Sequence, residues 1–246
     1  MALCPQCQQP LPDAPERFCP HCGAELAPAA RVTPWEERER IGFISALVET
    51  TQQILTRPTD FFRAMPVTGG LGSPLFYGVI VGYVGIVASA IYGAIFQAVA
   101  GPSLFGMSHR GELDRFLPYL QGGLGVVFQI VLGPLLVAVA LFISSAILHV
   151  LLLLFGGAPR GFEATFRVRC YAEAASVIRL IPFCGTAIFV IYILILAIVG
   201  LSEAHRIGRG RAAAAVLVPL LLFCCCCTGV IIVMLGGLAS ALGNLK

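Results

Sequence analysis

The residues most able to do chemistry are four cysteines near the start of the chain. They occur as Cys4-Pro5-Gln6-Cys7 and Cys19-Pro20-His21-Cys22-Gly23, two CxxC pairs separated by eleven residues. A tetrahedral zinc ion held by four thiolates needs two tight turns that each present two sulfurs, and the prolines and the final glycine favour such turns. The spacing predicts a zinc ribbon over residues 1–26, in which Cys4, Cys7, Cys19 and Cys22 bind Zn²⁺.

We expect this zinc to be structural, because four protein sulfurs fill a tetrahedral ion and leave no position for a reactive water. Metal binding would also supply most of the folding free energy of so short a segment. The alternative is two disulfides in an exported segment, which is disfavoured because no apolar signal stretch precedes Cys4. His21 lies between the ligands of the second pair, where the turn should point it into solvent. Residues 27–33 then form a linker.

The composition places the rest of the chain in a membrane. Of the 246 residues, 58% are hydrophobic and 12% are charged, which excludes a water-soluble globule. The formal net charge of +3 is too small and too scattered for a nucleic-acid surface, so no nucleic-acid partner is expected. Only one of the sixteen basic residues is a lysine, and this arginine-rich skew is typical of GC-rich coding sequences and suggests a bacterial source.

An amphipathic helix is predicted over residues 34–57. Thr33 and Glu36, with a proline between them, form the capping-box pattern that begins a helix. Apolar residues then recur with helical periodicity, and charged residues take the other side. We expect this helix to lie on the membrane surface with Trp35 and Phe43 as interface anchors. Packing of the same apolar face onto other helices would leave the same pattern.

Five stretches are predicted to cross the membrane. The first two carry no formal charge and exceed the length needed for a hydrocarbon core of about 30 Å. The predicted spans are residues 75–100, 122–155, 168–182, 183–201 and 212–238. Small residues of the first span fall near one stripe and predict close approach of another helix of the same molecule. They are Gly78, Gly82, Gly85, Ser89 and Gly93.

Loop charge decides between alternatives at two of these spans. Residues 122–155 could be one kinked helix or two short ones, and residues 168–182 could be a surface helix or a short span. With a cytosolic N-terminal region, one crossing at 122–155 keeps the arginine-rich loop after it inside. A hairpin of 168–182 with 183–201 then returns the next basic loop to the cytosol. Twelve of the sixteen basic residues lie on the cytosolic side in this topology.

Few polar side chains fall within the predicted spans. Glu173 is a functional candidate, because ionisable groups at membrane depth are costly, but Arg169 lies four residues earlier and could pair with it. His149 is predicted to make interhelical hydrogen bonds, and so is Gln129. These residues form neither a nucleophile with its base nor an open metal site. No catalytic residues are assigned, and the protein is not expected to be an enzyme.

Four motifs follow one another along the chain. They are Arg57-Pro58-Thr59-Asp60-Phe61-Phe62, Gly161-Phe162-Glu163-Ala164-Thr165-Phe166-Arg167-Val168, Tyr171-Ala172, and Gly200-Leu201-Ser202-Glu203-Ala204-His205. With the zinc ribbon and the order of the spans, they resemble bacterial Yip1-domain proteins over roughly residues 45–240. Relatives often carry a proline shortly after the Tyr-Ala pair, where this chain has Ala174 and Ala175. The resemblance implies a five-helix membrane domain with a cytosolic N-terminal region. In eukaryotic relatives it implies vesicle trafficking and contact with prenylated small GTPases.

The predicted fold is an all-α polytopic membrane protein. Five transmembrane helices form a Yip1-like domain over residues 58–246, and the Cys4 zinc ribbon and the amphipathic helix precede it. The N-terminus is expected in the cytosol, and the expected location is the inner (cytoplasmic) membrane of a bacterium. The five spans show no evident internal repeat and no pair of broken helices, which argues against the commonest transporter designs.

The function favoured by these features is non-enzymatic. The membrane domain would organise the bilayer or dock partners, while the zinc ribbon recruits a protein. The expected partners are the lipid bilayer and a protein at the ribbon, and self-association into a homo-oligomer stays open. The alternative is a small transporter or channel in which Glu173 and His149 line a path. A zinc-dependent membrane enzyme is disfavoured because all four ligand positions of the predicted zinc are taken.

Overall fold

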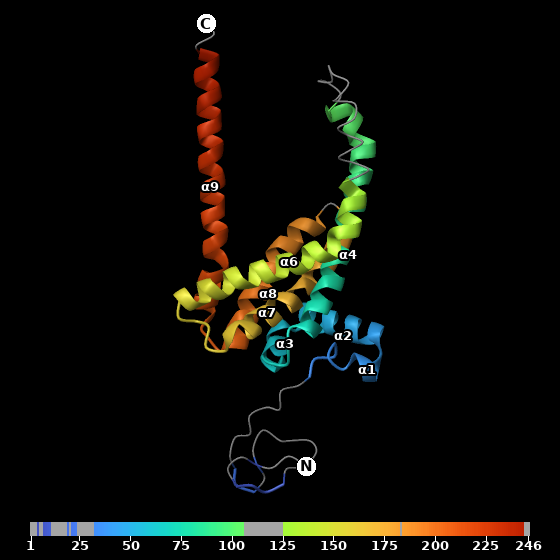
Figure 1. Cartoon of the computed structure of the whole chain (residues 1–246), viewed down its shortest axis with the longest axis vertical. Helices are drawn as coiled ribbons and strands as arrows, with labels where there is room; N and C mark the ends of the chain where they lie inside the picture. Colours follow the sequence, from blue (N-terminus) through green and yellow to red (C-terminus); the bar gives the residue numbers. More distant parts are fainter. Residues whose placement is uncertain are drawn as a thin grey trace.

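The computed structural model describes residues 4, 7–10, 19, 21–23, 32–105, 125–182 and 184–243 of the chain. The three longer stretches are largely helical. Their elements are α1 (Arg38–Ile41), α2 (Phe43–Thr56), α3 (Pro58–Ala64), α4 (Gly72–Phe105), α6 (Gly125–Leu154), α7 (Gly161–Ala172), the 3₁₀ helix η2 (Glu173–Leu180), α8 (Gly185–His205) and α9 (Arg209–Gly243). In Figure 1, α1 to α3 lie together at the foot of the helical bundle, and α9 rises along its side.

The expected single amphipathic helix over residues 34–57 is divided in the structure. Residues 34–37 form turns, α1 makes a single turn of helix, and α2 begins at Phe43 after a break at Gly42. Gly42 has a φ of +92°, a backbone conformation that glycine adopts without the steric penalty of a Cβ. The helix therefore ends there and restarts in a new direction.

Helix α2 packs one face and leaves an apolar edge outside. Ala46, Thr50 and Ile54 are buried, and their spacing of four residues places them on one face of the helix. Ile44 and Val48, on the neighbouring side of the same helix, are more than half exposed. Of the two uses predicted for this helix, packing onto the bundle occupies part of the apolar surface, and the remainder is free to contact lipid.

Four helices among the described residues are long and apolar enough to cross a membrane. They are Gly72–Phe96 of α4, Ile130–Leu154 of α6, Gly185–His205 (all of α8) and Arg209–Cys226 of α9. Helix α6 is one continuous helix that contains Pro134, so the described part of residues 122–155 is not divided into two short helices. Many large apolar side chains on these four helices are exposed, as lipid-facing residues must be.

The predicted third span, residues 168–182, differs from the expectation. No helix that meets the length and hydropathy of a span begins at 168 in the described chain. Instead α7 begins at Gly161, and the chain tightens into the 3₁₀ helix η2 from Glu173. At rises of about 1.5 and 2.0 Å per residue, the twelve and eight residues of these helices together measure roughly 34 Å.

This composite helix, α7 followed by η2, is the central helix of the bundle. Nearly every residue from Ala164 to Ser176 is buried, because α4, α6 and α8 all pack against it. It runs parallel to α4, from a contact between Gly78 and Cys170 to a hydrogen bond from Tyr92 Oη to the Leu180 carbonyl. Its polar side chains from Thr165 to Ser176 are thereby largely shielded from the bundle surface.

The central helix runs antiparallel to α8. Near the start of α8, Gly185 lies against the backbone of Ile178, and near its end Gly200 lies against Val168. The two helices are joined by a short connection at residues 181–184. The antiparallel hairpin predicted for this part of the chain is therefore present, although its first arm is longer and less regular than expected.

The stripe of small residues on α4 faces the central helix. A Cβ at Gly78 would lie 3.1 Å from the Cys170 carbonyl oxygen, and one at Gly85 would lie 2.9 Å from that of Ser176. A Cβ at Gly82 would lie 3.4 Å from the side-chain carboxylate of Glu173, whereas a Cβ at Gly93 would find no atom within 4 Å. Close packing along the first three glycines lets α4 approach the central helix, as the sequence predicted, and the fourth lies beyond the contact.

Candidate metal centre and buried polar networks

The four cysteines predicted as zinc ligands lie together. Their Sγ atoms are all within 4.8 Å of one another, with Cys4 and Cys22 3.8 Å apart and Cys7 and Cys19 3.7 Å apart. Sulfurs about 2.3 Å from a tetrahedral zinc ion lie roughly 3.8 Å from each other, whereas disulfide sulfurs lie about 2.05 Å apart. The arrangement therefore fits a metal tetrahedron better than two disulfides.

The two halves of the cysteine cluster have the same backbone geometry. The Cys4 carbonyl accepts a hydrogen bond from Gln8 N, and the Cys19 carbonyl accepts one from Gly23 N, both at 2.9 Å. Gln8 and Gly23, each the residue directly after a CxxC pair, have φ values of +55° and +68°, in the left-handed region. His21 is exposed, so it extends into solvent as its position in the second turn predicted.

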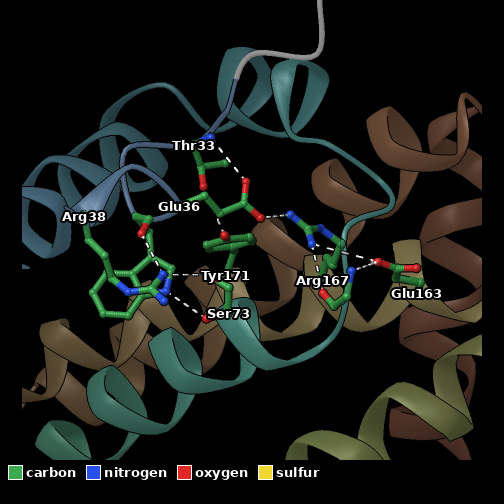
Figure 2. Close-up of polar contacts among 9 residues, drawn as sticks. Thr33, Glu36, Arg38, Ser73, Glu163, Arg167 and Tyr171 are labelled. Carbon is green, nitrogen blue, oxygen red and sulfur yellow. Dashed lines mark hydrogen bonds and ion pairs between the residues drawn. The ribbon is translucent and has the colours of Figure 1, made fainter. Parts of the chain in front are cut away.

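Arg167 of the central helix is the centre of a buried ion-pair network (Figure 2). Its side chain has no exposed surface. Nη2 donates to Oε1 of Glu36, and Nη1 donates to the Gly70 carbonyl over 3.0 Å. Gly69 and Gly70 have φ values of +128° and +93°, which lets the loop before α4 wrap the guanidinium. Gly70 N in turn donates to Glu163 at 2.6 Å.

Residues 33–38 anchor the N-terminal side of this network, and we call them the latch. Thr33 Oγ1 lies 3.1 Å from the Tyr171 hydroxyl, and Glu36 accepts the backbone N–H of Thr33 at 3.5 Å while its other oxygen meets Arg167. Arg38 Nη1 donates to the Ser73 hydroxyl at 2.9 Å. The latch is thus bonded both to the central helix and to the start of α4.

Trp35 is the hydrophobic centre of the latch, and its predicted role as an interface anchor is wrong. Its side chain is fully buried, and its indole N–H donates to the Ser73 carbonyl at 2.7 Å. The rings of Phe43, Phe76 and Tyr77 surround it at centroid distances of 5.3, 5.7 and 5.6 Å. Burying an indole of this size contributes about 4–6 kcal/mol as an upper bound.

A second buried polar chain joins three helices near the end of α8. Thr165 Oγ1 lies 3.0 Å from His149 Nδ1 and 2.9 Å from His205 Nε2. A hydroxyl can donate to one ring nitrogen and accept from the other, so one hydrogen-bonded chain connects α6, α7 and α8. His149 therefore makes the interhelical hydrogen bond that the sequence predicted. His205 Nδ1 has no partner among the described residues.

Glu173, the unusual residue of the predicted spans, is held by two neighbours on its own helix. Arg169 Nη1 donates to Oε1 and Ser176 Oγ donates to Oε2, both at 2.7 Å. The predicted pairing of Glu173 with Arg169 is confirmed. Eight residues of helix, about 12 Å of rise, separate Glu173 from Thr165, the partner of His149. The structure does not bring Glu173 and His149 together.

The end of the bundle where α6 gives way to α7 and α8 gives way to α9 carries much of the positive charge, and we call it the basic end. Arg63 of α3 donates to Glu203 of α8 at 3.0 Å, and this hydrogen bond, with the charge of the carboxylate, raises the pKa of the Arg63 guanidinium. Burial and the neighbouring charge of Arg206 lower the pKa of Arg160. Crowded cations of this kind are typical of a surface that faces anionic headgroups.

Two residues of the ion-pair network have contacts that the sequence does not indicate. The Thr33–Glu36 capping box is a local pattern, and nothing in it indicates that Glu36 also pairs with Arg167, 131 residues away. The burial of Arg167 was equally invisible, since arginine is commonly exposed. The side chain of Gln129 lies outside the described residues.

The motifs that suggested a family likeness meet in the fold. Phe61 stacks edge-on against Tyr171 at 5.3 Å, and a Cβ at Gly200 would lie 3.2 Å from the ring of Phe62. Each contact joins two motifs that are far apart in the sequence. They hold α3, the central helix and α8 together at the basic end.

Comparison with known families agrees with this convergence. The model of the Yip1 domain matches residues 53–241, which include α3, the bundle helices and all four motifs. No curated protein and no solved structure matches the chain. The matched region covers most of the sequence and contains the four helices of the described chain that are long and apolar enough to span a membrane. The chain belongs to the Yip1 domain family.

Proposed function

We propose that this protein is a non-enzymatic membrane scaffold whose Yip1 domain crosses the membrane five times and whose N-terminal zinc ribbon docks a protein partner in the cytosol. The observation that carries the proposal is the pairing of buried polar groups with one another. Arg167 of the central helix pairs with Glu36, and Arg169 pairs with Glu173. Thr165 of the same helix is hydrogen-bonded to His205. Such groups hold the bundle together and leave no reactive set facing a cavity.

The fifth crossing is the central helix. Its length of roughly 34 Å matches a hydrocarbon core of about 30 Å, and it runs beside α4 and antiparallel to α8. Its low hydropathy is compatible with membrane depth because α4, α6 and α8 separate it from lipid. With five crossings, the basic end lies in the cytosol, in agreement with the positive-inside rule.

Zinc in the ribbon is supported by the fit of the four sulfurs to a tetrahedron and by the matching turns of the two CxxC pairs. The residues that would hold it are Cys4, Cys7, Cys19 and Cys22. With all positions taken, the ion would stabilise the fold of the ribbon and present its surface to a partner. The bilayer itself is the second partner, in the inner membrane of a bacterium.

The membrane surface is the proposed place of α2. Its exposed Ile44 and Val48 lie on the helix that also bears Phe43, whose ring contacts Phe76 of α4 at 6.2 Å. Because Phe76 belongs to a spanning helix and is half exposed, the free edge of α2 continues a lipid-facing surface. An in-plane helix at the headgroup level has this arrangement.

Crosslinking of the full-length protein in native membranes tests the docking role. Proteins captured by the N-terminal region are identified for the wild type, for a Cys4→Ser/Cys19→Ser variant, and for a Cys184→Ser control, which changes an exposed cysteine outside the cluster. We expect the double variant alone to lose a defined partner. The same set of captured proteins in all three samples would refute the docking role of the ribbon.

A further inference from the structure

The latch, residues 33–38, is an appended element that docks on the family domain. The Yip1 match begins at residue 53, so the latch lies before it. The groups that receive the latch lie inside the matched region, and we call them the Arg167 site. They are Gly70, Ser73, Tyr77, Arg167 and Tyr171.

The Arg167 site receives the carboxylate of Glu36 incompletely. Nη2 of Arg167 bonds to a single oxygen of Glu36, while Nε on the same edge of the guanidinium is buried without a hydrogen-bond partner among the described residues. The second oxygen of Glu36 is directed to the N–H of Thr33. The carboxylate of Glu163 lies 4.0 Å from Nη1 and is bonded to Gly70 N. On this edge of the buried guanidinium, Nη2 therefore has a hydrogen-bond partner and Nε has none among the described residues.

Carboxylates bind most strongly to arginine through two parallel hydrogen bonds. Glu36 does not make that pair, because its second oxygen accepts the backbone N–H of Thr33 in the capping box. A carboxylate from another chain, free of the capping box, can engage Nε and Nη2 together. The latch has the advantage of covalent connection, which acts as an effective concentration in the millimolar range for a short tether.

We propose that the Arg167 site is a recognition site for an acidic peptide segment of a partner protein, one with an aromatic residue directly before a carboxylate, and that the latch occupies this site in cis. The preference for an aromatic residue follows from Trp35, which fills the space between Phe43, Phe76 and Tyr77 and bonds to the Ser73 carbonyl. The carboxylate follows from the guanidinium behind it. Occupation by the latch keeps the site closed until a partner segment replaces it.

This inference deepens the proposed scaffold role, because it names a second docking site in the membrane domain. It does not depend on the zinc ribbon. The test below leaves the four cysteines of the metal cluster unchanged, so its failure would not contradict the docking role of the ribbon. A failure of the ribbon experiment would likewise not contradict the proposal for the Arg167 site.

The latch can be followed directly because Trp35 is the only tryptophan in the chain. The full-length protein is placed in nanodiscs of phosphatidylcholine, and tryptophan emission and acrylamide quenching are measured. Glu36→Gln removes the charge that faces Arg167, and Glu37→Gln is the matched control because Glu37 pairs only with the exposed Arg40 in the described chain. We expect a red shift and at least about threefold stronger quenching in Glu36→Gln alone, because removing one partner of a buried ion pair is strongly unfavourable.

Binding in trans is measured by fluorescence anisotropy with a labelled peptide of residues 30–41. We expect the Glu36→Gln protein to bind this peptide at least about tenfold more tightly than the wild type or Glu37→Gln, since its own latch competes less well. A peptide with glutamine at position 36 should bind at least about tenfold more weakly. Equal binding of the two peptides, or Trp35 emission unchanged in Glu36→Gln, would overturn the proposal.

A second variant and a second lipid composition complete the test. If Glu36→Gln does not fold, Glu36→Asp retains the charge on a shorter side chain, and we expect intermediate quenching and intermediate peptide binding. The wild type is also examined in nanodiscs with added phosphatidylglycerol, where we expect unchanged emission. Exposure of Trp35 by the anionic lipid alone would identify a phosphate headgroup as the occupant and overturn the assignment to a peptide.

Discussion

The guanidinium of Arg169 donates a hydrogen bond to the Glu173 carboxylate over 2.7 Å, across the point where the central helix tightens from α to 3₁₀. Ser176 occupies the other oxygen of the same carboxylate. Ionisable side chains in membrane domains are often part of a transport path, but the Glu173 carboxylate forms an ion pair with a neighbour on its own helix. The geometry favours a structural role for Glu173.

Replacing Glu173 with glutamine is therefore expected to destabilise the protein. Arg169 loses its counter-charge in a poorly solvated place, so the free energy of unfolding should fall by about 1–3 kcal/mol. Denaturant titration in mixed micelles measures this change. Solute flux into proteoliposomes that is present in the wild type and disappears in Glu173→Ala would instead support the transporter hypothesis.

Removal of the cysteine ligands should eliminate bound metal. We expect about one zinc ion per purified chain in the wild type and less than about a tenth of that in Cys19→Ser, because three sulfurs no longer close a tetrahedral structural site. Elemental mass spectrometry measures the metal content. Cys184→Ser, at an exposed cysteine, should retain the full amount. Equal zinc in all three proteins would place the metal elsewhere.

The glycine stripe of α4 offers a matched pair of substitutions. A Cβ at Gly85 would approach the Ser176 carbonyl to 2.9 Å, whereas one at Gly93 meets nothing within 4 Å. Gly85→Ala should cost about 1–3 kcal/mol because the backbones of two helices must separate. Gly93→Ala should be neutral or stabilising by up to about 1 kcal/mol, because alanine favours the helix. Unfolding in mixed micelles compares them, and equal effects would contradict the packing described.

Thr165 links His149 and His205 through hydrogen bonds of its hydroxyl group. Thr165→Val keeps the shape but leaves both ring nitrogens without a partner, which should cost about 1–2 kcal/mol. Thr165→Ser keeps the hydroxyl and should retain most of the stability. Thermal unfolding in micelles distinguishes the two variants. A valine variant as stable as the wild type would show that the hydrogen-bonded chain contributes little.

Reporter fusions test the path of the central helix. We expect fusions after Gly157 and Ile207 to report a cytosolic position, and fusions after Arg110, Cys184 and Lys246 to report the opposite side. Alkaline phosphatase and a fluorescent protein supply complementary signals for the two sides. Fusions after Gly157 and Cys184 on one side of the membrane would show that α7 and η2 do not cross it.

Local sequence patterns were sufficient to predict several features. Hydropathy located α4, α6, α8 and the first part of α9, because a helix that faces lipid must be apolar over its whole length. The pairing of Arg169 with Glu173 follows from a spacing of one helical turn. The cysteine cluster likewise depends on the CxxC spacing within each turn. Each of these features depends on residues that lie close together in the sequence.

Tertiary packing alone decided the rest. Hydropathy records how well a segment suits lipid, so it could not show that residues 161–180 form a central helix sheltered by α4, α6 and α8. The capping box was legible in Thr33 and Glu36, but the partner of Glu36 is Arg167, which only the docking of the latch brings within reach. Trp35 was assigned to the membrane surface for the same reason: an apolar side chain is stabilised by lipid and by a protein interior alike, and only the packed structure distinguishes them.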